Sequence, residues 1–206
     1  MKKAALIANG WIDNYEKTKS LIEKASFYLA VDGGLKHCKQ MQIQPNLLIG
    51  DFDSCDLELL EEYASVPRKS FPRKKDHTDL EIALLEPVLE DYDDIFVYGA
   101  FGGRIDHFLA NIFLLSRYKK NLVFENEQER LFMVQKNLVF NTKVGQTLSL
   151  IALNGRVESI TTSGLEWNLD GEDLSFERIG ISNCCIEDRV CIQHEGGHLL
   201  CVLQNT

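Results

Sequence analysis

Residues 50–54 place two carboxylates two positions apart, directly after the apolar run 47–49. Residues i and i+2 of a strand point to the same side, so Asp51 and Asp53 are expected to converge on one small target. Two like charges held this close raise each other's energy unless a positive charge lies between them. A hard divalent cation with oxygen ligands, above all Mg²⁺, is the usual partner, and it commonly brings a phosphate. The alternative interpretation of this motif alone is a tight surface turn.

Three further polar clusters are expected at the same edge of a sheet. Asp32-Gly33-Gly34 end one strand, residues 99–107 follow a later strand, and residues 74–79 come where a helix begins. Ligands of an open parallel sheet bind beyond the carboxyl ends of the strands. Taken singly, each cluster is also explained as a turn, as a partner of a helix dipole or as exposed charge. Four clusters at one edge favour a ligand site.

The loop Gly99-Ala100-Phe101-Gly102-Gly103 is similar to a phosphate-binding loop, because its backbone N–H groups precede a helix N-terminus. It lacks the Gly-Lys-Ser/Thr end of a Walker loop, so that motif is excluded. Arg104 follows the glycines and is expected to contact phosphate. His107 lies nearby, although a histidine is more often a structural hydrogen-bonding residue than a general base.

The composition is that of an ordinary globular protein, with 206 residues, 45% hydrophobic and 26% charged. A net charge of −9 argues against nucleic-acid binding, whereas a nucleotide carried with its own metal remains compatible. The six cysteines form no Cys-x-x-Cys pair, so we expect reduced thiols and no structural zinc. The basic start has too short an apolar run for a signal peptide, and no stretch is long enough to cross a bilayer. A cytoplasmic protein is expected.

The first 125 or so residues alternate short apolar strands with helical patterns. Thr78 is predicted to be a helix N-cap with Glu81 as its capping-box partner, and Pro87 is predicted to end or kink that helix. This alternation predicts an α/β fold, a three-layer α/β/α domain with a mostly parallel sheet. The predicted strands are 4–8, 27–31, 47–49, 95–98 and 122–124, and the predicted helices are 15–25, a short one before Pro45, 56–64, 78 onward and 105–118.

After about residue 126 the pattern changes to short strands separated by Gly, Asn and Asp. The predicted strands are 131–134, 138–140, 147–152, 157–161, 174–176, 190–193 and 199–203. They predict an all-β unit that is sandwich- or barrel-like. We place the boundary near 126–129, which gives domains 1–127 and 128–206.

Together these motifs resemble the thiamine pyrophosphokinase family. The motifs that carry the resemblance are Asp32-Gly33-Gly34, Gly50-Asp51-Phe52-Asp53-Ser54, Lys75-Asp76-His77-Thr78-Asp79, Gly102-Gly103-Arg104-Ile105-Asp106-His107, Thr162-Ser163-Gly164-Leu165-Glu166-Trp167-Asn168-Leu169 and Ile181-Ser182-Asn183. The resemblance implies an α/β nucleotide domain followed by a β-rich thiamine-binding domain. It also implies transfer of a pyrophosphoryl group from ATP to the hydroxyethyl oxygen of thiamine, giving thiamine diphosphate and AMP.

The resemblance assigns roles to individual residues. Asp51, Asp53 and Asp79 would hold Mg²⁺ against the triphosphate. Asp32 and Asp106 would sit around the reacting end, and Arg104 and Lys75 would neutralise phosphate charge. The residues expected to contact ATP are Asp32, Gly33, Gly34, Lys75, Thr78, Gly102, Gly103 and His107. Such a reaction depends mainly on positioning and charge stabilisation. Either Asp106 or Asp79 would accept the proton of the attacking alcohol, and the sequence does not choose between them.

For the second domain, the resemblance implies a homodimer in which the β-domain of one subunit completes the active site of the other. Ser182 and Asn183 match the thiamine-contacting segment. Trp167 is expected in the core or at the dimer interface rather than stacked on thiamine. Cys201 stands where some members carry a stacking aromatic residue, so stacking must come from elsewhere or be absent. The pair Cys184-Cys185 is also unusual, and small buried side chains are the simplest account of it.

Three other functions fit part of the sequence. The first is a pyrophosphokinase for another heterocyclic alcohol, such as a pterin. The second is a non-catalytic thiamine or nucleotide sensor, which retention of all the carboxylates argues against. The third is an Asp-x-Asp phosphatase, which needs Thr or Val two residues beyond the second Asp, where Cys55 and Asp56 do not fit.

Overall fold

The computed structural model describes residues 1–53, 55–74, 76–118 and 120–205. It divides into two compact units, Met1–Glu127 (unit 1) and Gln128–Thr206 (unit 2). Lys75, which is expected to contact ATP, lies outside the described residues.

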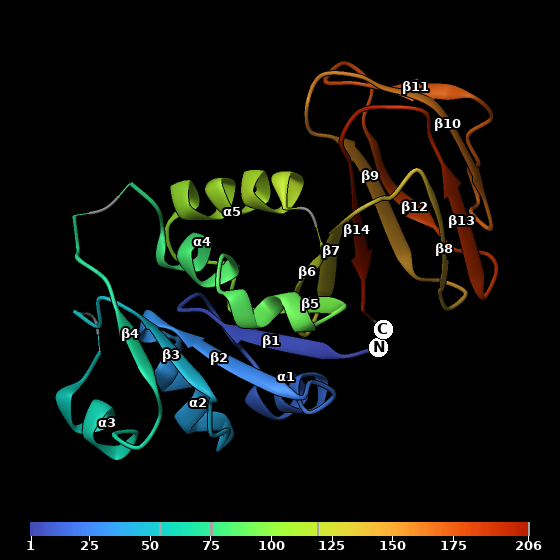
Figure 1. Cartoon of the computed structure of the whole chain (residues 1–206). Helices are drawn as coiled ribbons and strands as arrows, with labels where there is room; N and C mark the ends of the chain where they lie inside the picture. Colours follow the sequence, from blue (N-terminus) through green and yellow to red (C-terminus); the bar gives the residue numbers. More distant parts are fainter. Residues whose placement is uncertain (54, 75, 119, 206) are drawn as a thin grey trace. The chain divides into compact units, whose positions relative to one another are not determined.

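Unit 1 is built on a sheet with the strand order β6-β5-β1-β2-β3-β4 (Figure 1). Its strands are β1 (Lys3–Ile7), β2 (Phe27–Val31), β3 (Leu47–Gly50), β4 (Arg68–Ser70), β5 (Asp94–Tyr98) and β6 (Asn121–Glu125). Neighbouring strands pair in parallel, as the sequence predicted. Because β1 pairs with β2 on one side and β5 on the other, the chain changes direction across the sheet at β1. That is the point where parallel sheets open a crevice for ligands.

Helices cover both faces of this sheet. They are α1 (Tyr15–Ile22), α2 (Leu35–Met41), α3 (Leu57–Glu62), α4 (Asp79–Leu84) and α5 (Ile105–Arg117), with the 3₁₀ segments η1 (Asp32–Gly34) and η2 (Pro87–Asp91). Figure 1 shows α4 and α5 on one side of the strands and α1, α2 and α3 on the other. The predicted three-layer α/β/α fold is therefore confirmed.

The strands of unit 1 are buried on both faces, which is why their sequences are continuous apolar runs. Leu6, Leu29, Leu48 and Ile95 have no exposed surface.

Helix α4 is capped by the Thr78 side chain, which accepts a hydrogen bond from the Glu81 backbone N at 3.2 Å. The Glu81 carboxylate pairs with His77 at 3.1 Å and with Arg117 at 2.6 Å. It therefore ties the start of α4 to the end of α5.

Unit 2 consists of two antiparallel sheets with the strand orders β12-β9-β14-β7 and β11-β10-β13-β8. The strands are β7 (Glu129–Met133), β8 (Asn137–Asn141), β9 (Thr147–Ala152), β10 (Val157–Ser163), β11 (Glu172–Leu174), β12 (Gly180–Cys184), β13 (Arg189–Gln193) and β14 (Leu199–Gln204). One core, including Leu148, Ile160, Ile192 and Leu199, draws residues from both sheets. The predicted all-β sandwich is confirmed.

Two strands, β4 and β12, were not predicted. All three residues of β4 are exposed, so this strand at the end of the sheet carries no apolar signal. In β12 the pairing with β9 shifts register between Gly180 and Asn183. Ser182 there has a φ of 59°. Such a bulge breaks the alternation by which a strand is recognised.

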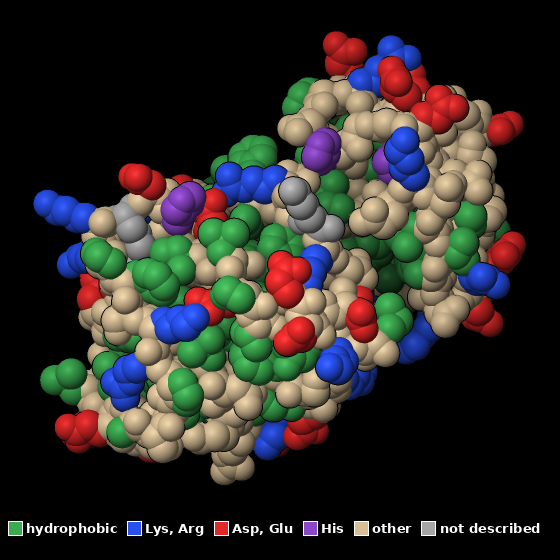
Figure 2. All heavy atoms as spheres, viewed as in Figure 1, with side chains coloured by type: hydrophobic (Ala, Val, Ile, Leu, Met, Phe, Trp, Pro, Cys, Tyr) green, Lys and Arg blue, Asp and Glu red, His purple; other side chains and the backbone are tan. Residues whose placement is uncertain are grey.

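All six cysteines are free thiols. Cys38, Cys185 and Cys201 are buried, and the other three are partly buried. Within the described ranges, no helix is long and apolar enough to span a membrane. On the face shown in Figure 2, basic side chains are scattered among acidic and hydrophobic ones.

Candidate active site

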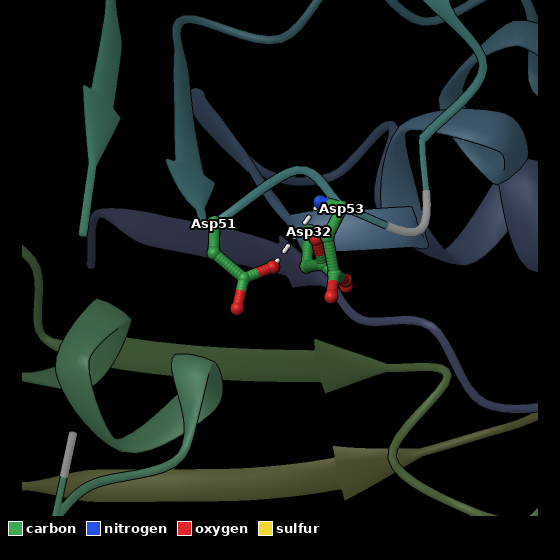
Figure 3. Close-up of side chains that lie close together, drawn as sticks. All are labelled: Asp32, Asp51 and Asp53. Atoms are coloured by element: carbon green, nitrogen blue, oxygen red, sulfur yellow. Dashed lines mark hydrogen bonds between the residues drawn. The ribbon is translucent and has the colours of Figure 1, made fainter. Parts of the chain in front are cut away.

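Three carboxylates meet where β2 and β3 end. These neighbouring parallel strands pair Val31 with Ile49, so the residues that follow them emerge side by side. One carboxylate oxygen each from Asp32, Asp51 and Asp53 lies within 4.8 Å of the other two (Figure 3). We call these residues the carboxylate cluster. The sequence predicted the convergence of Asp51 and Asp53, and the pairing of β2 with β3 adds Asp32.

The backbone at the carboxylate cluster adopts unusual conformations. Asp32 has a φ of 48° and Phe52 a φ of 59°, in the left-handed region that residues with a bulky side chain rarely adopt. The Phe52 backbone N donates to Asp32 Oδ1 at 3.2 Å, and the Asp53 backbone N donates to Asp51 Oδ1 at 3.2 Å. These bonds hold the turn that follows β3, and the first of them ties it to the end of β2. Conformations of this kind cost about 1–3 kcal/mol each and concentrate at functional sites.

The electrostatic field of the carboxylate cluster is negative. Burial raises the pKa of the neighbouring Cys55 thiol to about 11, and the charges of Asp32, Asp51 and Asp53 add to the rise. Arg73 supplies a positive charge at one side, with Nε 3.2 Å from Asp53 Oδ2. The cluster offers only hard oxygen donors, the set that Mg²⁺ and Mn²⁺ prefer. These residues therefore fit a hard divalent cation.

A cleft of about 360 Å³ opens at the carboxyl ends of β1, β2 and β5. Its lining residues are Ala8, Asn9, Gly10, Val31, Asp32, Thr78, Asp79, Leu80, Gly99, Ala100, Gly102, Gly103, Arg104, His107 and Asn111. We call it the polar cleft, because most of its lining residues are glycines or carry polar or charged side chains. Asp32 belongs both to this cleft and to the carboxylate cluster, so the two are continuous.

Two loops close against each other to form the polar cleft. Gly10 N donates to Gly99 O and Trp11 N donates to Phe101 O, both at 2.8 Å. A Cβ at Gly10 would lie 2.2 Å from Phe101 O and 2.3 Å from Gly99 O. Only glycine fits at this position. The loop after β1 is thereby fixed to the glycine loop after β5.

The buried His37 side chain supports this junction from α2. His37 Nε2 lies 2.8 Å from Gly10 O, and His37 Nδ1 lies 2.9 Å from the Tyr15 hydroxyl. Burial lowers the pKa of His37 to about 4. The neutral imidazole then donates to Gly10 O and accepts from Tyr15, so it acts as a fixed strut at neutral pH.

Helix α5 begins at the polar cleft. His107 and Asn111, one turn apart, both line the cleft. Asn111 Nδ2 donates to Ala100 O at 3.0 Å, which ties the glycine loop to the helix. Backbone N–H groups at a helix N-terminus attract anions. A phosphate in the cleft would therefore meet favourable charge.

Arg104 and Asp106 form an exposed bidentate ion pair. Arg104 Nε is 3.0 Å from Asp106 Oδ1, and Arg104 Nη2 is 2.5 Å from Asp106 Oδ2. The hydrogen bond from Arg104 lowers the pKa of the Asp106 carboxyl. Asp106 is thus a weaker proton acceptor than an ordinary aspartate while this pair persists.

The structure places the predicted residues of unit 1 in three groups. Asp32, Asp51 and Asp53 form the carboxylate cluster. Thr78, Asp79, Gly102, Gly103, Arg104 and His107 line the polar cleft together with Asp32. Gly33 and Gly34 are buried in η1 behind Asp32. Asp79 was predicted as a third metal ligand. It lines the polar cleft and, among the described residues, is not part of the carboxylate cluster.

Four residues of the site were not predicted from the sequence: Asn9, Gly10, Asn111 and Arg73. Asn9-Gly10 directly follow β1, so the rule that marked the other strand ends would have found them. Arg73 lies within a basic run that precedes Asp76. Asn111 carries no local signal, because its role depends on which face α5 presents to the cleft.

Unit 2 contains a pocket of about 240 Å³. Its lining residues are Leu148, Leu150, Thr162, Leu165, Trp167, Leu169, Leu174, Arg178, Ile179, Gly180, Ile181 and Asn183. We call it the apolar pocket. Asn183 Nδ2 donates to Trp167 O at 2.7 Å, and Asn183 Oδ1 accepts from Trp167 N at 3.2 Å. Asn183 therefore holds the segment that carries Trp167 at the pocket.

One of the two places expected for Trp167 is wrong. The Trp167 side chain is 62% exposed, so a place in the core of the unit is wrong. Cys201 lies in β14 with no exposed surface, and burial raises the pKa of its thiol. This position cannot present a stacking surface to a ligand. Ser182 contributes its backbone N–H to Ser149 Oγ at 3.0 Å, and its side chain is exposed beside the pocket.

A parallel α/β unit with carboxylates and a glycine loop at its strand ends is typical of proteins that bind a phosphorylated ligand with a metal. Two family models match the chain, described as "Thiamin pyrophosphokinase, catalytic domain" over residues 18–124 and "Thiamin pyrophosphokinase, vitamin B1 binding domain" over residues 135–199. The chain belongs to the thiamin pyrophosphokinase family.

Several characterised proteins resemble the chain. It is 30% identical to thiamine pyrophosphokinase 1 of Oryza sativa subsp. japonica over 74% of this chain and 64% of the relative. It is 25% identical to thiamine pyrophosphokinase of Bacillus subtilis over 98% of both chains. The chain spans 64% and 55% of the length of two rice relatives, which are longer proteins.

Solved structures share the fold. The crystal structure of the Bacillus subtilis thiamine pyrophosphokinase superposes with a TM-score of 0.86 at 23% identity over 100% of both chains. The Candida albicans thiamin pyrophosphokinase gives a TM-score of 0.85 at 17% identity, over 100% of this chain and 89% of that one.

Proposed function

We propose that this protein transfers a pyrophosphoryl group from ATP to the hydroxyethyl oxygen of thiamine, giving thiamine diphosphate and AMP. The observation that carries the proposal is the continuity of the carboxylate cluster with the polar cleft. Together they offer metal ligands and anion-binding groups along one surface. Family membership supplies the identity of the two substrates.

The polar cleft would bind the polyphosphate. The backbone N–H groups of Gly102 and Gly103 and the start of α5 would face its oxygens, and Arg104 would neutralise part of its charge. Asp32, Asp51 and Asp53 would hold Mg²⁺. When bound, this cation offsets the negative charge of the phosphates and of the developing transition state. The chain thereby contributes mainly orientation and charge, as phosphoryl-type transfer requires.

The thiamine hydroxyl must lose its proton as it attacks phosphorus. Asp79 lines the polar cleft, whereas Asp106 is engaged by Arg104 and also accepts from the His107 backbone N at 3.0 Å. A carboxylate with a lowered pKa accepts a proton less readily. We therefore assign the acceptor role to Asp79. Whether Asp79 also contacts the metal remains a prediction.

The apolar pocket of unit 2 would bind the rings of thiamine. Its leucine and isoleucine lining suits a flat, weakly polar group, and the exposed Trp167 face beside it can stack on a cationic or aromatic ring. Asn183 would position Trp167 rather than reach the ligand, because both atoms of its amide are used by the protein backbone. Ser182 remains the candidate for a direct polar contact.

A homodimer with a shared active site stays a prediction, as does a cytoplasmic location. An exposed apolar stripe on α5 supports the dimer. Ile105, Leu109 and Phe113 follow the i, i+4, i+8 spacing of one helix face and are 77%, 52% and 56% exposed. Hydrophobic side chains are visible on unit 1 in Figure 2. Light scattering after size-exclusion chromatography tests the mass, and a Leu109→Lys variant should shift it toward the monomer.

Product analysis tests the reaction. The purified protein is incubated with ATP, thiamine and Mg²⁺, and nucleotides and thiamine esters are separated by chromatography. We expect AMP and thiamine diphosphate in equal amounts, and neither product without thiamine. Formation of ADP with thiamine monophosphate would instead define an ordinary kinase. Replacing thiamine with a hydroxymethyl pterin tests selectivity, and turnover of the pterin at the thiamine rate would overturn the assignment.

A further inference from the structure

Trp11 is a large aromatic side chain without a role in the core. It is 66% exposed, although burial of an indole stabilises a protein by more than that of most side chains. Its backbone is fixed, because Trp11 N donates to Phe101 O at 2.8 Å. An indole ring that is held in a fixed place and yet left exposed to solvent forgoes the stabilisation of burial, which suggests that it binds a ligand.

One face of the Trp11 ring is covered by the glycine loop. A Cβ built at Gly102 would lie 2.2 Å from Trp11 Cδ2 and 2.5 Å from Cγ. The indole therefore lies directly against the bare Cα of Gly102, and any larger residue there would displace it. Because the side chain is largely exposed, the opposite face of the ring is open.

Trp11 is a direct neighbour of residues that line the polar cleft. Gly102, on which the ring rests, lines the cleft, and so do Asn9 and Gly10, which directly precede Trp11. Among the described residues that line the cleft, none is Phe, Tyr or Trp. The cleft thus supplies polar contacts for phosphates but no broad aromatic surface for the base of a nucleotide. Trp11 supplies such a surface next to it.

We propose that Trp11 is the stacking platform for the adenine base of ATP, with the Gly102 backbone as its support. This inference rests on the proposed function, since it takes the polar cleft to hold the phosphates of the same nucleotide. Base–aromatic stacking is strong and tolerant of base identity. Trp11 therefore sets affinity for a nucleoside over a bare polyphosphate, and it discriminates little between purines.

Two other interpretations make different predictions. If Trp11 only braces the glycine loop, its loss weakens binding of any polyphosphate, with or without a base. If the imidazole of His107, which also lines the cleft, carries the base, then His107→Ala and not Trp11→Ala raises the KM for ATP.

Kinetics separate these interpretations. In Trp11→Ala, we expect the KM for ATP to rise about tenfold, kcat to stay within about twofold and the inhibition constant of inorganic tripolyphosphate to stay unchanged. Trp11→Phe, which keeps a ring, should restore most of the affinity. Phe176→Ala removes an aromatic side chain that is 73% exposed in unit 2 and serves as the matched control, with no change in the KM for ATP.

Fluorescence provides a readout independent of turnover. The chain has two tryptophans, so Trp167→Phe leaves Trp11 as the sole indole. We expect saturable quenching of its emission by ATP and by AMP with Mg²⁺, and none by tripolyphosphate or thiamine. A parallel loss of tripolyphosphate inhibition in Trp11→Ala, quenching by thiamine alone, or an unchanged KM for ATP would each overturn the stacking role. An unchanged KM with normal AMP production would leave the proposed function intact, whereas absence of AMP from the wild type would refute that function itself.

Discussion

The polar cleft of unit 1 and the apolar pocket of unit 2 are built in opposite ways. The cleft is made by loops at the ends of parallel strands, and much of its lining is backbone or short polar side chains. The pocket is lined chiefly by leucine and isoleucine side chains from an antiparallel sandwich. The cleft is suited to binding a charged group, and the pocket is suited to binding a flat apolar group. A reaction that joins a polyphosphate to a flat ring needs both kinds of surface.

The two sites also differ in how they are held in place. In the cleft, backbone hydrogen bonds such as Gly10 to Gly99 and left-handed residues such as Asp32 and Phe52 fix the geometry. In the pocket, side chains help to hold the segment of Trp167: Asn183 bonds the Trp167 backbone, and Thr162 Oγ1 accepts a hydrogen bond from the Leu169 backbone N. Substitutions in the cleft should therefore damage chemistry, whereas substitutions in the pocket should mainly change affinity for one substrate.

The largest effect is expected in the carboxylate cluster. Asp53→Asn removes one charge and one anionic ligand, so turnover should fall by about a thousandfold or more, an effect comparable to the loss of other charge-stabilising groups. The fold should persist, because removal of one of three crowded like charges relieves repulsion. Steady-state kinetics and thermal unfolding measure the two quantities.

Asp56→Asn is the matched control for that substitution. Asp56 caps α3 through the Glu58 backbone N at 3.1 Å, and asparagine caps a helix equally well. Its activity should match that of the wild type. Substantial residual activity in Asp53→Asn, with the control intact, would remove the metal-ligand role of Asp53.

The next largest effect is expected at Gly10. A methyl group there would collide with two backbone carbonyls, so Gly10→Ala should separate the loops that form the polar cleft. A displacement of about 1 Å can cost on the order of a hundredfold in rate. We expect a loss of that size in kcat/KM for ATP. Gly196→Ala in unit 2 controls for glycine replacement, since nothing lies within 4 Å of a Cβ there and its backbone is not in the left-handed region.

A smaller and more selective effect is expected at Asn183. Asn183→Ala removes both hydrogen bonds to the Trp167 backbone, so the KM for thiamine should rise about tenfold, the equivalent of about 1.4 kcal/mol. The KM for ATP should stay unchanged. Asn141→Ala, an exposed asparagine in β8, serves as the control. Equal changes in both KM values would contradict the division of labour between the units.

The smallest effect concerns pH and the His37 strut. The folded protein holds the pKa of His37 at about 4, against an ordinary value of 6.5, through burial, with a smaller contribution from Lys36. Below pH 6.5 the unfolded chain takes up a proton that the folded chain does not, so stability is lost as pH falls from 6.5 towards 4.

Glutamine offers an amide donor that can replace the bond from His37 Nε2 to Gly10 O, and it does not titrate. His37→Gln should therefore have a free energy of unfolding near that of the wild type at pH 7.5. Between about pH 6.5 and 5, its free energy of unfolding should fall less steeply than that of the wild type, by up to about 1 kcal/mol per pH unit. Urea unfolding at several pH values measures the difference between the two proteins. Identical slopes would show that His37 is not held neutral by the fold.

The carboxylates of the cluster could be predicted where position in the sequence determines the geometry of the side chains. Asp51 and Asp53 follow a strand at i and i+2, and the carboxyl ends of parallel strands share one edge, so their convergence followed from the pattern alone. Asp79 belongs to a helix start, and the distance of a helix from the strand ends depends on packing that no local pattern encodes. It accordingly lies in the cleft and outside the carboxylate cluster.

The thiamine side was harder to predict, again for a physical reason. Strand β12 contains a bulge at Ser182 and exposes polar residues, so it lacks the alternation that identifies a strand. Trp167 lies in the connection between β10 and β11, so its exposure depends on how that connection packs, whereas the burial of Cys201 depends on which face of β14 meets the core.

Metal binding tests the central claim most directly, namely that residues from two strand ends form one cation site. Mn²⁺ affinity can be measured by electron paramagnetic resonance in the presence of a non-hydrolysable ATP analogue, for the wild type, Asp32→Asn, Asp51→Asn, Asp53→Asn and the control Asp56→Asn. We expect binding to weaken about tenfold or more in each of the first three variants and to stay unchanged in the control. Wild-type Mn²⁺ affinity in all three cluster variants would contradict the account.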